Sequence, residues 1–388
     1  MSDAVIVSSV RTAIARSPGA LQDVPVERFG AAAMLEALRR ARLEPGEVED
    51  VIWGNAMAGG GNVGRLTALE AGLPVEVPAM TVDRQCGSGL QAICLADQAV
   101  RAGQCEVVLA GGSESMTRAP YLMERPTGAY QRMPPAFVRA RLAPDAVGNP
   151  PMGVTAENVA ERYRVSREDQ DAFALRSQER AVLAIREGRF KDQIVPLELP
   201  AGRGASRTFD VDENPRADTT LERLQALRPA FRQGGTVTAG NSSGINDGAG
   251  AAVVMSAAQA SRRGLEPLGR LVAWAVAGVD PNLMGMGPVP AVRKVLEKTG
   301  MDLDAIDLVE LNEAFASQTL ASIRELRVDM EKVNVNGGAI ALGHPIAATG
   351  AILTAKLLYE LRRSGGRYGI VTACIGGGQG IAAIFERL

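Results

Sequence analysis

The sequence predicts an α/β fold built from two similar halves, and three observations carry this prediction. Short apolar runs alternate with segments of helical periodicity over residues 4–118 and again in the last third of the chain, which is the pattern of layered α/β structures. The second stretch repeats the order of the first, so that residues 51–55 correspond to 308–312 and residues 107–112 to 370–377. A balance of 46% hydrophobic and 22% charged residues over 388 positions excludes a disordered chain.

In the first half, apolar runs predict strands, and apolar residues at helical spacing predict the helices between them. The helix over 29–42 ends in a group of arginines, where cations interact favourably with the helix dipole. The next helix has Leu90, Ile93 and Val100 at its apolar positions. The predicted strands are 4–7, 51–53, 80–82 and 107–110.

Residues 119–240 differ in character from both halves. Prolines punctuate their first third, and a helix is predicted from Ser166, a capping residue with acids in the following turn, to Gly188. We interpret this region as an inserted and mostly exposed lobe, after which strand-like sequence resumes at 251–255. The lobe would thus interrupt the first copy before its last strand, and equivalent turns of the two halves would face a shared cleft.

Composition and charge exclude several classes of function. A net charge of −2 and an aromatic content of 4% do not favour binding to nucleic acid or to an anionic membrane surface. No apolar run is long enough to span a membrane. The four cysteines form no C-x-x-C pair and the chain has one histidine, so we expect neither a disulfide framework nor a metal site. With an N-terminus unlike a signal peptide, these features predict a cytoplasmic protein.

Cys86 is the first candidate for chemistry, because it lies between a predicted strand and a predicted helix in a turn with Gly87 and Gly89. A thiol at a helix N-terminus lies at the positive end of the helix dipole, which predicts a lowered pKa and a nucleophilic thiolate. The alternative is a small buried residue at a tight turn. The strand–turn–helix context favours the nucleophile, whereas Cys94 and Cys105 are interpreted as small core residues.

Three further residues lie in turns suited to catalysis. His344 follows a glycine-rich segment, which favours a general base over a histidine that is merely part of the core. Cys374 ends a strand directly before Gly376 and its neighbouring glycines, whose backbone N–H groups suit either an oxyanion or a phosphate. Asn312 also ends a predicted strand.

Five stretches of the chain form a set that runs through both halves. They are DRQCGSGLQAI at 83–93, GNSSGINDG at 240–248, NEAFA at 312–316, NGGAIALGHP at 336–345 and CIGGG at 374–378. In this order they resemble the thiolase family, and the likeness covers essentially the whole chain. A related condensing enzyme of fatty-acid synthesis would carry one Cys with two His, whereas this chain has a single His and a second Cys.

The resemblance implies a thiolase fold, with duplicated five-stranded mixed-sheet α/β domains in a layered αβαβα arrangement and an inserted loop domain. The N-terminal half would comprise residues 1–117 and 245–266, the CoA-binding loop domain 118–244, and the C-terminal half 267–388. It also implies a homodimer or homotetramer, in which the two subunits of a dimer pair along the strand near Met80. Whether two dimers join through the proline-rich stretch near 120–135 is left open.

The activity implied by the resemblance is that of an acetyl-CoA C-acyltransferase. Such an enzyme reversibly cleaves 3-ketoacyl-CoA with CoA, or condenses an acyl-CoA with acetyl-CoA, by a ping-pong mechanism through an acylated Cys86. No permanently bound cofactor is expected, since CoA and acyl-CoA are substrates, and β-oxidation in fatty acid metabolism is the implied context. Two alternatives stay open: an acetoacetyl-CoA-specific biosynthetic enzyme, and a catalytically silent thiolase-like carrier or partner.

The resemblance also assigns roles to individual residues. Cys86 would be the nucleophile and His344 the base that deprotonates it. Cys374 would be the acid and base at the α-carbon, and Asn312 would hold a water that stabilises the enolate oxygen together with His344. The backbone N–H groups of Cys86 and Gly376 would form the other oxyanion hole.

Binding residues for CoA are implied in the same way. Ser243 would contact the pantetheine, and Arg216 would lie near the adenine or the phosphates. The remaining binding residues are Gly244 and Met152 and, along the tunnel, Phe231, Met284, Ala314 and Phe315.

Three positions depart from the family pattern. Pro151 stands where acetoacetyl-CoA-forming members carry a His, which indicates a broader or longer-chain degradative type. Ala347 stands where Gly is usual, so the turn beside His344 is expected to be slightly altered. Gln379 replaces the usual Met and brings a polar amide close to the site.

Overall fold

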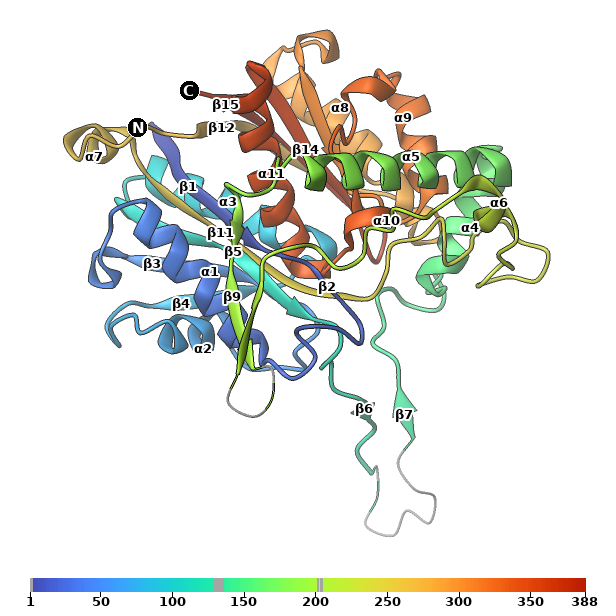
Figure 1. Ribbon diagram of the computed structural model, residues 1–388, viewed down its shortest axis with the longest axis horizontal. Helices are drawn as coiled ribbons and strands as arrows, with labels where there is room; N and C mark the ends of the chain where they lie inside the picture. Colours follow the sequence, from blue (N-terminus) through green and yellow to red (C-terminus); the bar gives the residue numbers. More distant parts are fainter. Residues whose placement is uncertain (1–2, 127, 129–135, 201, 203–204) are drawn as a thin grey trace.

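The computed structural model describes residues 3–126, 128, 136–200, 202 and 205–388. At its centre, two half-sheets alternate with three layers of helices (Figure 1). The expected αβαβα arrangement of duplicated halves is therefore confirmed. Within the described ranges, the protein has no helix with the length and apolar character needed to cross a membrane.

Along the joined sheet, the strand order of the second half is the reverse of the order of the first half. The first half runs β4 (Ala79–Val82), β3 (Asp50–Gly54), β5 (Val107–Ser115), β11 (Asn246–Ser256) and β1 (Ala4–Thr12). The second runs β12 (Gly269–Gly278), β15 (Gln379–Arg387), β14 (Tyr368–Ile375) and β13 (Leu308–Leu311). The fifth place in the second half is taken by Val333, which forms a parallel bridge with Val309 rather than a strand. Ile6 of β1 pairs with Gly269 of β12 and joins the halves.

Helices cover both outer faces and fill the space between the halves. The outer layer of the first half is α1 (Val26–Arg40) and α2 (Val63–Glu70), and that of the second is α8 (Pro288–Thr299) and α9 (Ala316–Leu326). The central layer is α3 (Ser88–Arg101) and α11 (Thr349–Ser364). These two helices are buried over most of their length, because each has a half-sheet on either side.

Glycines allow α3 and α11 to touch at their N-terminal ends. A Cβ atom at Gly350 would lie 2.3 Å from the backbone nitrogen of Leu90, and one at Gly89 would lie 2.7 Å from the carbonyl oxygen of Ala347. Neither distance accommodates a side chain without moving backbone. The turns that precede the two helices, one after β4 and one before α11, are consequently held against each other.

The inserted lobe joins the body less loosely than expected. The prediction of a mostly exposed lobe is wrong for α5, because Phe173, Ala174, Ser177 and Ala181 are buried along one face of this helix. In contrast, β6 and β7 lie on an arm that projects from the body (Figure 1). The lobe elements are β6 (Leu122–Met123), β7 (Phe137–Val138), α4 (Met152–Arg162), α5 (Arg167–Arg186), β8 (Ile194–Val195), β9 (Leu197–Pro200), β10 (Ser206–Phe209) and α6 (Leu221–Gln225).

Strand β2 (Ala15–Arg16) pairs with β11 at the margin of the first half-sheet. The remaining α-helices of the described residues, α7 (Ala257–Arg262) and α10 (Ala339–Leu342), are short.

A buried ion pair ties the lobe to the first half. Both Nη atoms of Arg11 on β1 donate to the carboxylate of Asp212, at 2.7 and 2.9 Å, and both side chains are fully buried. Arg11 Nε donates to Gln193 Oε1 at 2.8 Å, and its guanidinium lies 4.9 Å from the Phe190 ring centroid. The Ile14 N–H donates to the same carboxylate, so the pair is fully satisfied by hydrogen bonds.

Removing Asp212 would leave the Arg11 guanidinium buried without its partner. We expect Asp212→Ala to lower the free energy of unfolding by about 3–5 kcal/mol, as measured by urea denaturation. Asp145→Ala is the matched control, because Asp145 pairs with Arg141 in an exposed ion pair whose loss has little effect. Equal stability of the two variants would contradict a role for the buried pair in anchoring the lobe.

Candidate functional site

The candidate catalytic residues lie at the carboxyl ends of parallel strands in the two halves. Cys86 follows β4, Asn312 follows β13, and Cys374 lies near the end of β14. His344 lies in the turn between α10 and α11, and the turn just after it packs on the turn that holds Cys86. Ligand sites of α/β sheets form at such strand ends, and here the duplication brings two sets of them together.

Cys86 occupies a one-turn 3-10 helix, Gln85–Gly87, between β4 and α3. Its side chain is half-buried. The backbone N–H groups of Gly376 and of Cys86 itself lie close enough to the sulfur to favour its thiolate form. The two N–H groups that the sequence assigned to an oxyanion hole therefore converge on the sulfur of Cys86.

The predicted lowering of the Cys86 pKa is wrong. Burial raises the pKa of this thiol to about 11, and the charges of Glu114 and Asp83 add to the rise, against the hydrogen bond from the Gly376 N–H. Desolvation of a thiolate therefore outweighs the helix dipole at this position. Cys86 is a thiol at neutral pH, so its use as a nucleophile requires a base to accept the proton.

His344 is buried and contacts a side chain at each ring nitrogen. Nδ1 lies 2.6 Å from Thr349 Oγ1, and Nε2 lies 3.3 Å from Asn312 Nδ2. With the Asn312 amide oriented this way, its NH₂ group can only donate, so Nε2 accepts and Nδ1 carries the proton. This tautomer presents a basic Nε2 to the site.

The electrostatic environment keeps His344 uncharged. Burial lowers the pKa of the imidazole from 6.5 to about 4, because a buried imidazolium loses its hydration. The ring is therefore neutral at physiological pH and available as a base.

Asn312 has an unused hydrogen-bonding atom in the site. Its Oδ1 is buried and has no partner among the described residues, although a buried polar atom normally has one. This oxygen can accept a hydrogen bond from a water, in agreement with the expected water-holding role.

Cys374 is buried beside Cys86. Burial, followed by the charge of Cys86, raises the pKa of the Cys374 thiol well above its usual range. The residue belongs to an apolar cluster at the junction of the lobe and the second half. The other members of this cluster are Met152, Ala156, Val237, Met284, Ala314 and Phe315, so the structure brings together three of the expected tunnel residues and the expected binding residue Met152.

Phe231 completes this apolar wall. Its ring meets that of Phe315 edge to face, with centroids 6.0 Å apart. A Cβ atom at Gly153 would lie 2.1 Å from the Phe231 ring, so the ring rests directly on the backbone of α4.

A groove of about 220 Å³ runs along the lobe and is lined by two of the remaining candidates, Arg216 and Gly244, while Ser243 lies between two of its lining residues. Arg216, Gly244 and Ser242 line it, and Arg216 is exposed. The N–H of Ser243 donates to the Ala314 carbonyl at 3.0 Å. This hydrogen bond joins the segment beside the groove to Ala314 of the apolar cluster around Cys374.

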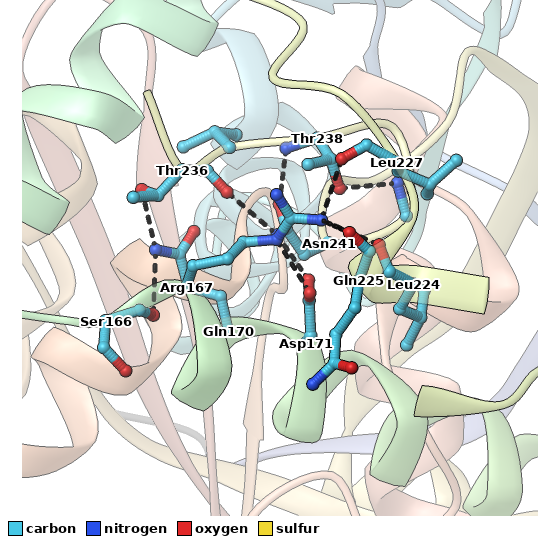
Figure 2. A network of polar contacts seen from close by, with 12 residues as sticks. Ser166, Arg167, Gln170, Asp171, Leu224, Gln225, Leu227, Thr236, Thr238 and Asn241 are labelled. Carbon is cyan, nitrogen blue, oxygen red and sulfur yellow. Dashed lines mark hydrogen bonds and ion pairs between the residues drawn. The ribbon is translucent and has the colours of Figure 1, made fainter. Parts of the chain in front are cut away.

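A polar network at the start of α5 supports the groove wall (Figure 2). Arg167 donates through Nε to Asp171 Oδ2 and through Nη2 to the Leu224 carbonyl, both at 2.7 Å. Asp171 Oδ1 accepts from Asn241 Nδ2 at 2.9 Å, and Asn241 Oδ1 accepts from the Thr238 N–H at 2.8 Å. Asp171 thus connects the helix to the turn that leads into the groove.

The three departures from the family pattern have defined places in the structure. Pro151 directly precedes α4. Ala347 is fully buried in the turn after His344. Gln379 Oε1 accepts from Arg84 Nη1 at 3.2 Å, which accounts for a polar side chain at this position.

Sequence reasoning missed the residues that orient His344. Thr349 contacts Nδ1, and the His344 N–H donates to Asn246 Oδ1 at 2.9 Å. Gly343 adopts a φ of 107°, and a Cβ atom there would lie 2.6 Å from the Asn246 side chain. Asn246 belongs to the 240–248 stretch, which marked it as a residue of interest. Its contact with His344 could not be read from the sequence, because the two residues are 98 positions apart.

The arrangement suits acyl transfer through a cysteine. It combines a thiol at the start of a helix, a neutral imidazole, a second thiol, and N–H groups beside the first sulfur. Among the described residues, no group of three or more His, Cys, Asp or Glu side chains could hold a metal ion. All four cysteines are unpaired.

Comparison with known proteins gives consistent matches over the chain. The model of the thiolase N-terminal domain matches residues 4–258, and that of the thiolase C-terminal domain matches 265–387. The chain is 49% identical to an acetyl-CoA acetyltransferase of Pseudomonas aeruginosa, over all of both chains. It is also 49% identical to the beta-ketothiolase BktB of Cupriavidus necator, over all of this chain and 99% of that one.

Solved structures agree with these matches. The acetyl-CoA acetyltransferase of Bacillus anthracis superimposes with a TM-score of 0.95 at 45% identity, over all of this chain and 99% of that one. Human mitochondrial 3-ketoacyl-CoA thiolase in complex with CoA superimposes with a TM-score of 0.92 at 42% identity, over all of this chain and 98% of that one.

The lowered pKa of His344 predicts a specific dependence of stability on pH. Because the unfolded chain binds this proton near pH 6.5 and the folded protein only near pH 4, stability should fall as the pH drops through this window. The loss should be on the order of 3 kcal/mol. Melting temperatures of the wild type and His344→Asn over this window test it, since the variant lacks the titrating ring. Equal slopes for the two proteins would show that the His344 pKa is not lowered.

Proposed function

The chain belongs to the thiolase family, and we propose that its catalytic side chains are Cys86, His344, Cys374 and Asn312. The protein is an acyltransferase with thiolase activity, as its full-length relatives are. The observation that carries the assignment is the convergence of two thiols. The backbone N–H groups of Gly376 and Cys86 lie near the Cys86 sulfur, and Cys374 lies close enough for the charge of that sulfur to raise its pKa.

In the first half-reaction, His344 Nε2 accepts the Cys86 proton as the sulfur attacks the keto carbon of 3-ketoacyl-CoA. Because both groups are neutral at rest, the proton moves together with the attack and no ion pair needs prior stabilisation. The N–H groups of Cys86 and Gly376 would then bind the developing oxyanion. One such donor contributes about 3 kcal/mol to the transition state in well-studied cases.

Cleavage of the carbon–carbon bond leaves the acyl group on Cys86 and releases the enolate of acetyl-CoA. His344 and the Asn312-held water bind the enolate oxygen, and the Cys374 thiol protonates the α-carbon. Free CoA then attacks the Cys86 thioester, and the Cys374 thiolate accepts the proton of the CoA thiol. The Cys86 sulfur leaves as the new acyl-CoA forms and takes back its proton from the His344 imidazolium. Each thiol thus returns to its starting state, in a ping-pong cycle.

The CoA chain is proposed to lie in the lobe groove and to enter the apolar cluster beside Cys374. Arg216 places an exposed cation at the groove for the phosphates or adenine, while Ser243 and Gly244 face the pantetheine. The CoA complex of the human thiolase, which this chain matches over its whole length, supports this placement.

A role in β-oxidation, on substrates longer than acetoacetyl-CoA, is favoured by Pro151 and by the apolar wall. Met152, Met284 and the two phenylalanines present no polar group to the acyl chain. The alternative of an acetoacetyl-CoA-specific enzyme is favoured by relatives named acetyl-CoA acetyltransferase. These two functions differ in chain length and share the catalytic residues. A catalytically silent carrier, in contrast, would not require the hydrogen bond between His344 and Asn312, so this contact favours an enzyme.

An oligomer is proposed from two exposed apolar features. Strand β4 lies at the edge of its half-sheet, directly before Cys86, and Met80 on it is exposed. On the projecting arm, Tyr121 and Phe137 are 88% and 71% exposed, and their ring centroids lie 5.6 Å apart. Pairing along β4 would make a dimer, and the arm would join dimers. Residues 129–135 of the proline-rich stretch lie outside the described residues.

The division into halves at 117/118, 244/245 and 266/267 remains part of the proposal. Its support is that β11 resumes the first half directly after the lobe and β12 opens the second half. A cytoplasmic location is supported by the four free cysteines, which are typical of reducing compartments.

The activity and its chain-length range are tested by thiolysis of 3-ketoacyl-CoA substrates from four to sixteen carbons. We expect turnover to extend beyond the four-carbon substrate and Cys86→Ala to lose at least about 10⁴-fold. Cys105→Ala is the matched control, since Cys105 is a half-buried thiol outside the site. Activity confined to acetoacetyl-CoA would favour the alternative function. Equal activity of the two variants would overturn the role of Cys86.

The network in Figure 2 predicts a binding defect. Asp171→Ala should raise the KM for CoA about five- to tenfold, equivalent to about one hydrogen bond, with little change in kcat. Asp169→Ala is the control, because Asp169 lies on the same helix as Asp171 and forms an exposed ion pair with Arg324 of α9. A KM for Asp171→Ala equal to that of this control would contradict a role for the network in CoA binding.

A further inference from the structure

Glu114 is a buried acid that the proposed mechanism does not use. It lies near the end of β5, is fully buried, and accepts four hydrogen bonds. Oε1 accepts from Asn55 Nδ2 at 2.9 Å and from the Met57 N–H at 3.1 Å, while Oε2 accepts from the Ala56 N–H at 3.1 Å and the Ala347 N–H at 3.2 Å. All its partners are donors, which fits an ionised carboxylate.

These contacts join the two segments that carry the nucleophile and the base. Ala347 lies in the turn Ile346–Ala348, three residues after His344. On the other side, the Asn55 N–H donates to the Val82 carbonyl at the end of β4, four residues before Cys86. The carboxylate therefore connects the first half, through Asn55, to the turn of the second half that holds the base.

We propose that Glu114 is a positioning residue for thiolysis, which holds the turn of His344 at the distance from Cys86 that proton transfer requires. This inference rests on the proposed function. Glu114 touches no substrate in this scheme and acts through the Ala347 backbone. A small displacement of a catalytic group lowers the rate by up to about a hundredfold.

The charge state of Glu114 gives this role a measurable signature. Burial raises the pKa of Glu114 to about 7, against the N–H donors of Met57, Ala347 and Ala56. Protonation would place an O–H donor opposite one of the N–H donors that Glu114 now accepts from. The hydrogen bond between the carboxyl group and that segment would then be lost. The rate should then fall as the pH drops through about 7.

Other titratable groups lie around this carboxyl, and the charge of Asp83 adds to the rise of its pKa. They are Asp83 and Cys86 in the turn after β4, Asp247 on β11, Glu27 on α1, Arg118 after β5, and the neutral ring of His344. His344 does not supply the same signature, because its pKa is about 4.

The test is the pH profile of kcat for thiolysis of acetoacetyl-CoA by the wild type and Glu114→Gln, between about pH 5.5 and 9. The wild type should lose rate below a pKa near 7. The variant should be about ten- to a hundredfold slower at the alkaline end, with KM nearly unchanged, and should lack this acid limb. Asp97→Asn is the matched control, because Asp97 is a buried acid with a pKa raised to about 6 that pairs with Arg101 on α3.

Each outcome decides the proposal. Retention of the acid limb in Glu114→Gln, or a kcat per active site equal to that of Asp97→Asn, would overturn it and leave Glu114 a purely structural residue. If Glu114→Gln does not fold, the wild-type profile decides alone, since a flat profile through pH 7 contradicts the role. Absence of thiolysis by the wild type at every pH would instead overturn the proposed function and the inference with it.

Discussion

The close approach of α3 and α11 is the constraint on which the site depends. Gly89 and Gly350 leave no room for side chains between the first turns of these helices, so the two halves meet backbone to backbone. Each helix follows a turn that carries a candidate catalytic residue, and the contact brings the Cys86 turn against the turn after His344. Duplication alone makes two similar domains with similar turns. The glycine contact makes one site of them, because it sets the distance between those turns.

The same close packing determines the charge states in the site. Burial raises the pKa values of Cys86 and Cys374 and lowers that of His344, so all three groups are neutral at rest. A charged site would require stabilising partners, which would compete with the oxyanion for the same N–H groups. The neutral site instead leaves Asn312 Oδ1 without a partner among the described residues, and the Gly376 N–H faces an uncharged thiol rather than a thiolate. Proton transfer and bond formation can then occur together, which limits the cost of creating charge in a dry environment.

Much of the fold and of the candidate site was predictable from local sequence. The repeated order of strands and glycine turns predicted the duplicated halves, since periodicity and turn chemistry are local properties. Cys86, His344 and Cys374 were identifiable as candidates because each lies beside glycine-rich sequence. The expectation of an exposed lobe was wrong for α5, because its polar composition hides a buried face whose partners are distant in sequence. The Cys86 pKa was also predicted in the wrong direction, because the local helix dipole was visible and the depth of burial was not.

By itself, the sequence determined the fold class, the duplication, the family and the residue types available for chemistry, because each of these depends on patterns within short segments. The tertiary structure alone decided how those residues act. It placed Thr349 and Asn312 on opposite sides of the His344 ring, so that Nε2 is the basic nitrogen. It also placed Glu114 between turns that are far apart along the chain. Tautomers, pKa values and long-range hydrogen bonds depend on distances between segments, and these distances exist only once the two halves have packed together.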